Sequence, residues 1–200
     1  INDGLWDAYG DVHMGSYAEL CAAKYEFSRE AQDDFAVRSY TKALKAQEQG
    51  WFLEEIVPVE LPSKSEQGRV LQDERLKRFN EAKLRGLAPV FQPEGTITAG
   101  NASGINDGAA AVMMMSAKKA TELGLKPLAR IKAYSSAGVD PSIMGIGPVP
   151  ASKLCLKKAG WTPKDLDLLE INEAFAAQAI AVNRDMGWDT TKVNVNGGAI

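Results

Sequence analysis

Cysteine and histidine are scarce in this sequence, which has two Cys and one His among its 200 residues. Two cysteines, Cys21 and Cys155, cannot build a disulfide framework, so we expect a reducing compartment. One histidine excludes a histidine-rich metal centre, and no zinc-ligand spacing occurs. Long apolar runs are missing too, since the longest, Ala109 to Met115, is far too short to cross a bilayer.

An excess of basic charge is also missing. The sequence has 23 Lys and Arg against 26 Asp and Glu, a net charge of −3, which disfavours non-specific nucleic-acid binding. Apolar residues make up 45% and charged residues 24%, as in folded globular chains, which excludes a mainly disordered or collagen-like chain. The length allows one ordinary domain or parts of two small ones.

The first third of the sequence is helical in pattern. Ser16 to Glu19 has the form of a capping box, which predicts a helix beginning there. Ser28 predicts the N-cap of a second helix that ends at Gly50, and residues 55–61 predict a strand.

Residues 62–88 have no clean period, which predicts a long irregular loop or several short helices. Seven basic and four acidic residues give this segment a charge of +3. These basic side chains either form a solvated surface or hold a phosphate-rich ligand, because Arg and Lys pair with phosphate oxygens. The seven are Lys64, Arg69, Arg75, Lys77, Arg78, Lys83 and Arg85.

From Gly95 onward, strand and helix patterns alternate, which predicts a layered α/β fold. We expect domain boundaries near residues 105 and 126. The expected strands are 109–115 (buried), 128–134, 166–171 and 193–196, and the expected helices are 116–124, 151–160, a short one at Thr162-Pro163, and 172–187.

Two further motifs allow more than one interpretation. Asn172-Glu173-Ala174-Phe175-Ala176 lies where a strand gives way to a helix, a usual place for ligand sites in α/β folds. Asn172 either caps that helix or uses its amide to hold a water or a carbonyl oxygen. The small-residue loop 98–108 either admits close approach of a ligand or connects two strands tightly.

The sequence favours structural roles for its single histidine and its two cysteines. A lone histidine such as His13 is more often structural than catalytic. Cys21 and Cys155 lie on apolar helical faces, which predicts core packing, and no basic neighbour that would activate them is evident.

Four motifs in order resemble the thiolase family, whose members join or cleave acyl groups on coenzyme A. They are His13-Met14-Gly15, Ser28-Arg29-Glu30 with Gln32-Asp33, the Ala99–Gly108 loop, and Asn172 to Ala176. The resemblance covers the whole chain and the middle half of the family's length. It implies an α/β fold, a partial layered αβαβα core with an inserted, mainly helical loop domain. Residues 1–105 would form the CoA-binding loop domain, 106–126 the end of the N-terminal core domain, and 127–200 the start of the C-terminal core domain.

Within the family, the His13-Met14 pair and Asp140 to Pro148 resemble the acetoacetyl-CoA-forming type. This implies an acyltransferase that reversibly condenses two acetyl-CoA into acetoacetyl-CoA and CoA through an acyl-cysteine. The alternatives are a degradative 3-ketoacyl-CoA thiolase of broader chain length and a non-catalytic protein that binds acyl-CoA or lipid. The resemblance also implies a homodimer or homotetramer, no nucleic-acid or membrane partner, and a cytoplasmic location, with mitochondria or peroxisomes as alternatives.

The family's nucleophilic Cys, its activating His and its acid/base Cys match no residue here, so we expect a segment of a longer protein that is inactive and poorly soluble alone. The resemblance assigns Asn172 a catalytic role in binding a water beside the thioester oxygen. It implies no cofactor beyond the substrate CoA, although some relatives bind potassium. It assigns CoA contacts to Tyr40, Arg78, Phe79, Asn80, Lys83 and Ser103, apolar lining to His13, Met14, Phe91, Ala99, Met144 and Phe175, and potassium to Tyr40, Ala99, Gly100, Ala102 and Ile200.

Overall fold

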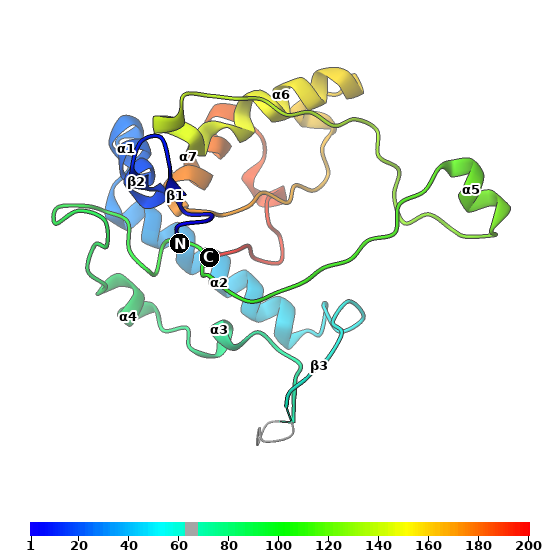
Figure 1. Cartoon of the computed structure of the whole chain (residues 1–200), viewed down its shortest axis with the longest axis horizontal. Helices are drawn as coiled ribbons and strands as arrows, with labels where there is room; N and C mark the ends of the chain where they lie inside the picture. The colour runs from blue at the N-terminus through cyan, green and yellow to red at the C-terminus, as the bar shows by residue number, and fades with distance from the viewer. Residues whose placement is uncertain (63–67) are drawn as a thin grey trace.

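Three helices form the centre of the molecule in a computed structural model that describes residues 1–62 and 68–200. Helices α1 (Met14–Tyr25) and α2 (Arg29–Glu48) both pack against α7 (Ala176–Met186), as Figure 1 shows. The other helices are α3 (Glu74–Lys77), α4 (Glu81–Arg85), α5 (Ala117–Glu122) and α6 (Pro148–Ala159), with 3-10 turns η1 (Pro141–Ile146), η2 (Pro163–Asp165) and η3 (Thr190–Lys192).

The described strands are short and form two antiparallel pairs. β1 (Trp6–Asp7) pairs with β2 (Val12–His13), and β3 (Val59–Glu60) pairs with β4 (Arg69–Val70). The strand predicted over 55–61 is therefore confirmed only at its end. The predicted strands 166–171 and 193–196 meet side by side in parallel, but through a single bridge between Leu169 and Val193.

The N-caps of α1 and α2 decide the two capping predictions, at Ser16 and Ser28. Ser28 caps α2 as predicted, because its Oγ accepts a hydrogen bond from the Ala31 amide at 3.1 Å. The predicted cap at Ser16 is wrong. The N-cap of α1 is His13, whose Nδ1 accepts from the Gly15 amide at 2.9 Å, so Ser16 falls inside the first turn. Helices α5, α6 and η2 confirm the predicted helices over 116–124, 151–160 and at Thr162-Pro163.

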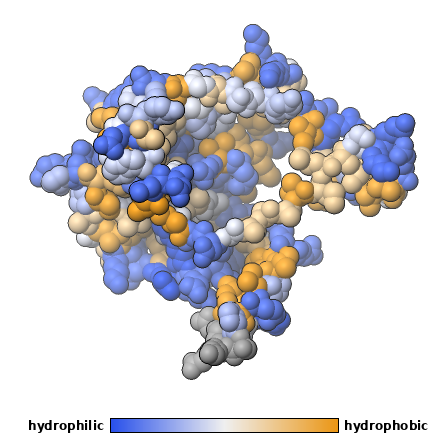
Figure 2. Space-filling view, in the orientation of Figure 1, coloured by the Kyte–Doolittle hydropathy of each residue, from blue (hydrophilic) through white to orange (hydrophobic). Residues whose placement is uncertain are grey.

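The predicted buried strand over 109–115 is wrong, and so is the strand over 128–134. Both segments are extended and exposed, and they lead to and from α5, which lies apart from the rest in Figure 1. Met113 is 85% exposed and Leu128 fully exposed, and apolar residues colour this projection in Figure 2. A strand needs neighbours for its main-chain hydrogen bonds, and no described residue pairs with either segment.

Small side chains on α7 let the other central helices approach closely. Ala176, Ala177 and Ala181 have no exposed surface, and each packs in a different apolar cluster. The Ala181 cluster includes Cys21, and burial raises the pKa of the Cys21 thiol. A neutral, buried thiol is a core residue, as predicted, whereas Cys155 on α6 is only half-buried.

The buried carboxylate of Glu19, on α1, binds the main chain of residues 96 and 97. Glu19 is 5% exposed and accepts hydrogen bonds from the amides of Thr96 and Ile97 at 2.8–3.0 Å. The Thr96 hydroxyl donates to the same carboxylate at 3.0 Å and accepts from Gln32 of α2 at 2.9 Å. Within the described chain no Lys or Arg pairs with Glu19, so these N–H and O–H donors replace its lost hydration.

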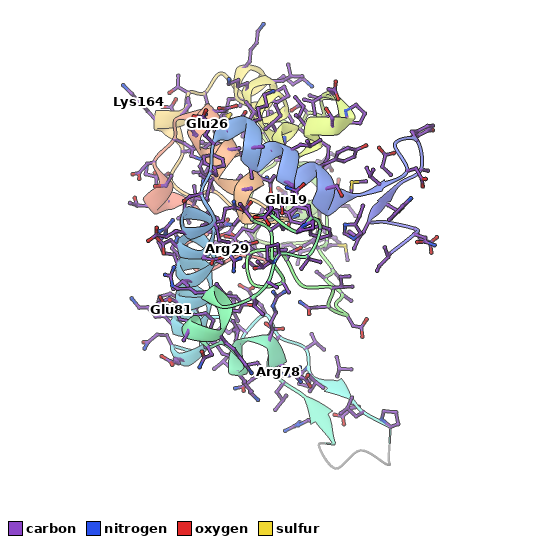
Figure 3. All side chains as sticks on the ribbon, turned by 90° about the vertical axis from the view of Figure 1, so that its left-hand side faces the viewer. Glu19, Glu26, Arg29, Arg78, Glu81 and Lys164 are labelled. Atoms are coloured by element: carbon purple, nitrogen blue, oxygen red, sulfur yellow. The ribbon has the colours of Figure 1, made fainter. Side chains whose placement is uncertain are left out.

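We expect Glu19→Gln to destabilise the protein by roughly 2–3 kcal/mol, because the new NH2 group faces amide donors that lose their charged acceptor. Thermal unfolding followed by circular dichroism measures this as a lower midpoint temperature. Glu26→Gln is the matched control, since Glu26 is exposed at the end of the same helix (Figure 3). Equal midpoints for the two variants would contradict the role given to Glu19.

Candidate active site

The small-residue loop is the place where the four sequence motifs meet. Asn101 lies at its centre with no exposed surface, and its Oδ1 accepts from the Thr98 amide at 2.8 Å. Its Nδ2 donates to Asp33 of α2 and to the Thr96 carbonyl, both at 2.9 Å. The side-chain amide of Asn101 thus closes the turn that begins at Thr98 and links it to Asp33 of the second motif.

Asp33 is held in turn by Arg29, one turn earlier on α2. The Arg29 Nε donates to Asp33 at 2.8 Å, and its Nη2 donates to the carbonyls of Arg85 and Leu87 at 3.3 and 2.9 Å. This Arg29–Asp33 pair explains the spacing of the second motif, because residues four apart face each other on a helix. It fixes both the small-residue loop and the end of α4.

The loop then pairs with the fourth motif. Ala102 forms an antiparallel bridge with Phe175, and the Ser103 amide donates to the Ala174 carbonyl at 3.0 Å. The Ala176 amide donates to the Asn101 carbonyl at 2.9 Å, which satisfies a free N–H at the start of α7. Ser103 is thereby held beside the segment that follows Asn172.

Aromatic and sulfur side chains gather on the other side of Phe175. His13 stacks on Phe91 with ring centroids 4.8 Å apart, and Phe91 meets Phe175 edge to face at 6.3 Å. Met14 and Met144 pack in the same cluster. Five of the six residues predicted as apolar lining therefore lie together, whereas Ala99 is exposed and is not part of that cluster.

Asn172 does not cap the helix that follows it. The N-cap of α7 is Phe175, so the capping interpretation is wrong. The Asn172 side chain is exposed and makes no hydrogen bond to any residue within 1–62 and 68–200. Its amide is left free to donate to a bound molecule.

Glu173, which sequence reasoning passed over, anchors this turn. It is 2% exposed and accepts from Ser39 of α2 at 2.6 Å and from Asn194 at 2.8 Å. The Ile200 amide donates to the same carboxylate at 3.3 Å, and a side chain on Gly198 would collide with it. An acidic residue directly before the apolar run Ala174 to Ala177 was the available signal for a buried, hydrogen-bonded carboxylate.

Four of the predicted CoA contacts lie on or beside the short helices α3 and α4. Phe79 stacks on Tyr40 at 4.6 Å, and Asn80 caps α4 by accepting from the Lys83 amide at 2.9 Å. Lys83 and Arg78 are exposed, and among the described residues Arg78 pairs only with Glu74, at 3.3 Å. Short helices, one of the two alternatives for residues 62–88, are confirmed here, while Lys64 lies outside the described residues.

An open depression of about 570 Å³ adjoins these helices and is rich in cations. Arg69, Lys77 and Arg78 line it, and Glu74 is the one acidic residue among the described residues of the lining. Such a surface suits phosphate oxygens, because Arg and Lys donate charged hydrogen bonds to them.

Among the predicted potassium ligands, Tyr40, Ala99 and Ala102 converge on one cation, the guanidinium of Arg75. Its Nε donates to the Tyr40 hydroxyl at 2.6 Å, and its Nη2 donates to the carbonyls of Ala102 and Ala99 at 3.2 and 3.4 Å. Of the other two, Ile200 packs in the cluster that holds Tyr40, and Gly100 backs onto Leu84. No cluster of three or more His, Cys, Asp or Glu side chains suited to a metal occurs within residues 1–62 and 68–200.

None of the helices described for residues 1–62 and 68–200 has the length and apolar character needed to span a membrane.

Family models for two domains match this chain. Residues 1–118 match the model of the thiolase N-terminal domain, and residues 125–200 match that of the thiolase C-terminal domain. The acetyl-CoA acetyltransferase of Allochromatium vinosum is 58% identical over 202 residues, which cover all of this chain and 51% of that protein.

Solved structures of related enzymes have the same fold as this chain. The Bacillus anthracis acetyl-CoA acetyltransferase has a TM-score of 0.92 at 50% identity, covering 98% of this chain and 50% of that one. Human mitochondrial 3-ketoacyl-CoA thiolase in complex with CoA has a TM-score of 0.91 at 44% identity, covering 98% and 49%. The chain spans about half the length of the curated relatives it matches, and the predicted partial thiolase-like α/β fold is confirmed. The chain belongs to the thiolase family.

Proposed function

We propose that the whole protein is an acetyl-CoA acetyltransferase, which condenses two acetyl-CoA into acetoacetyl-CoA and CoA and runs the reverse thiolysis. The observation that carries this proposal is the exposed amide of Asn172, which has no partner among the described residues and lies on a turn anchored by buried Glu173. Two relatives of that name, 58% and 59% identical, support the assignment. Thiolysis of acetoacetyl-CoA by CoA, assayed with the whole protein, tests it directly.

Asn172 acts by donating hydrogen bonds where negative charge develops. Removing a proton from the acetyl methyl group of acetyl-CoA puts charge on the thioester oxygen, and a water held by the Asn172 amide stabilises that charge. A hydrogen bond that strengthens as the charge forms lowers the barrier more than it strengthens binding. The Glu173 network fixes the main chain beside Asn172, so the amide needs little reorganisation.

The nucleophile and the proton acceptor come from parts of the whole protein beyond these 200 residues. Cys21 is unsuited because it is 1% exposed and burial raises the pKa of its thiol. The His13 Nδ1 already accepts from Gly15, and its ring is stacked on Phe91. Both side chains support the local structure instead of the bond-making step.

Coenzyme A binds across α3, α4 and the small-residue loop in this proposal. The cationic depression around Arg78 receives the phosphates, and Ser103 adjoins the narrow pantetheine arm. The apolar group of Met14, Phe91, Met144 and Phe175 lies beyond it and limits the acyl chain. Human mitochondrial 3-ketoacyl-CoA thiolase, which has this fold, has been solved in complex with CoA, and that complex supports CoA as the ligand.

We also propose the domain bounds and the assembly of the protein. The loop domain covers 1–105, the end of the N-terminal core 106–126, and the start of the C-terminal core 127–200. The change from one family model to the next between residues 118 and 125 supports the second boundary. The exposed apolar segments support association with further core structure, in a homodimer or homotetramer in the cytoplasm.

A 3-ketoacyl-CoA thiolase of broader chain length is the second candidate, favoured by the 44% identity to the human mitochondrial enzyme. The two candidates differ in how long an acyl chain the apolar group admits. We expect faster thiolysis of acetoacetyl-CoA than of 3-ketooctanoyl-CoA when kcat/KM is compared for the whole protein. A preference for the longer substrate would favour the second candidate.

We expect Asn172→Ala to lower kcat by about 10²–10³-fold, the loss typical of removing one donor to a developing oxyanion. The midpoint of thermal unfolding stays unchanged, because the side chain is exposed and makes no hydrogen bond to described residues. Steady-state kinetics of the whole protein measure the effect. Asn2→Ala, which removes another exposed amide, is the control, and equal kcat for the two variants would count against the role of Asn172.

We expect Arg78→Ala to raise the KM for acetyl-CoA about tenfold, because one charged hydrogen bond to the ribose 3′-phosphate is lost. With 3′-dephospho-acetyl-CoA the difference between variant and wild type should disappear. Lys164→Ala is the control, since Lys164 is also exposed but lies at the opposite end of the molecule in Figure 3. An unchanged KM for Arg78→Ala would refute the contact.

A further inference from the structure

Arg75, on α3, directs its guanidinium toward the small-residue loop and α2. Its guanidinium joins three segments that are distant in sequence: Tyr40 on α2, the small-residue loop, and α3 itself. The Cζ atom lies 5.6 Å from the centre of the Tyr40 ring, so the same cation also faces an aromatic surface. Arg78, three residues later, instead pairs with Glu74 at the surface.

The acceptors around Arg75 are all neutral oxygens. They are one phenol hydroxyl and two main-chain carbonyls, and none of the described carboxylates pairs with this arginine. By contrast, Arg29 and Arg85 both have carboxylate partners. Neutral carbonyl oxygens that converge on one point are the ligands with which proteins replace the hydration shell of potassium.

The fit of the guanidinium is close. Its Nη1 is shielded from solvent, and it finds no hydrogen-bond partner in the part of the chain that the structure describes. The same nitrogen lies against Gly104, where a Cβ atom would displace it. The guanidinium thus packs directly against the small-residue loop.

We propose that Arg75 takes the place of a bound monovalent cation and makes the small-residue loop independent of potassium. Three of the five positions assigned to potassium by resemblance, Tyr40, Ala99 and Ala102, already direct their oxygens at the guanidinium. A second positive charge among the same oxygens would be repelled without a carboxylate to balance it. The residues present thus do not fit a potassium ion while Arg75 is in place.

Arg75 holds the small-residue loop in place, and this role is independent of the reaction that the protein catalyses. Arg75 is accordingly a positioning residue. Its removal exposes the vacated hydroxyl and carbonyl oxygens to solvent ions, and a potassium ion can then bind them.

Thermal unfolding of the whole protein in potassium, sodium and tetramethylammonium chloride at equal ionic strength tests the proposal. We expect the wild type to have the same midpoint temperature in all three salts. Arg75→Ala should unfold several degrees lower in tetramethylammonium chloride and regain part of the loss in potassium chloride. Lys77→Ala, which removes an exposed charge from the same helix, should show neither effect.

Two results would overturn the proposal: a potassium-specific rise in the midpoint of the wild type, or an Arg75→Ala midpoint equally low in all three salts. If Arg75→Ala does not fold in any salt, Arg75→Gln goes through the same series. Its shorter, uncharged side chain keeps hydrogen-bond donors, so we expect a smaller loss and the same recovery in potassium. Absence of that recovery would also count against the proposal.

Discussion

Buried carboxylates on α1 and α2 hold the segment on which the rest of the structure depends. Glu19 binds the amides at residues 96 and 97, and Asp33 binds the Asn101 amide. Neither carboxylate faces bulk water, so breaking these bonds would remove donors that replace its lost hydration. The fixed loop then pairs with Phe175 and supplies the carbonyls that meet Arg75.

The same loop divides the site into parts of different chemistry. On one side lie the packed aromatic rings of His13, Phe91 and Phe175. On the other lie α3 and α4, whose cations face solvent and suit phosphates. Acetyl-CoA, the proposed substrate, has this same order, with a charged nucleotide at one end and a small acyl group at the other.

The sequence alone predicted most helices, but the predicted strands over 109–115 and 128–134 did not form, and those over 166–171 and 193–196 are reduced to a single bridge. Residues 109–115 have the apolar composition of a buried strand, yet they are exposed. Composition reports what a segment buries in its folded setting, whereas a strand forms only beside another strand. A chain that spans half the length of its relatives supplies no such neighbour among the described residues.

The sequence by itself determined the family, the helical character of the first third and the excess of positive charge near Arg78, because motifs and composition are local properties. Tertiary structure decided which interpretation of each motif holds. It left the Asn172 amide without a partner among the described residues by starting α7 at Ala176, and it buried Glu173 among donors from three segments. It also set Arg75 among neutral oxygens, because only folding brings residues 40, 75 and 99–102 to one point.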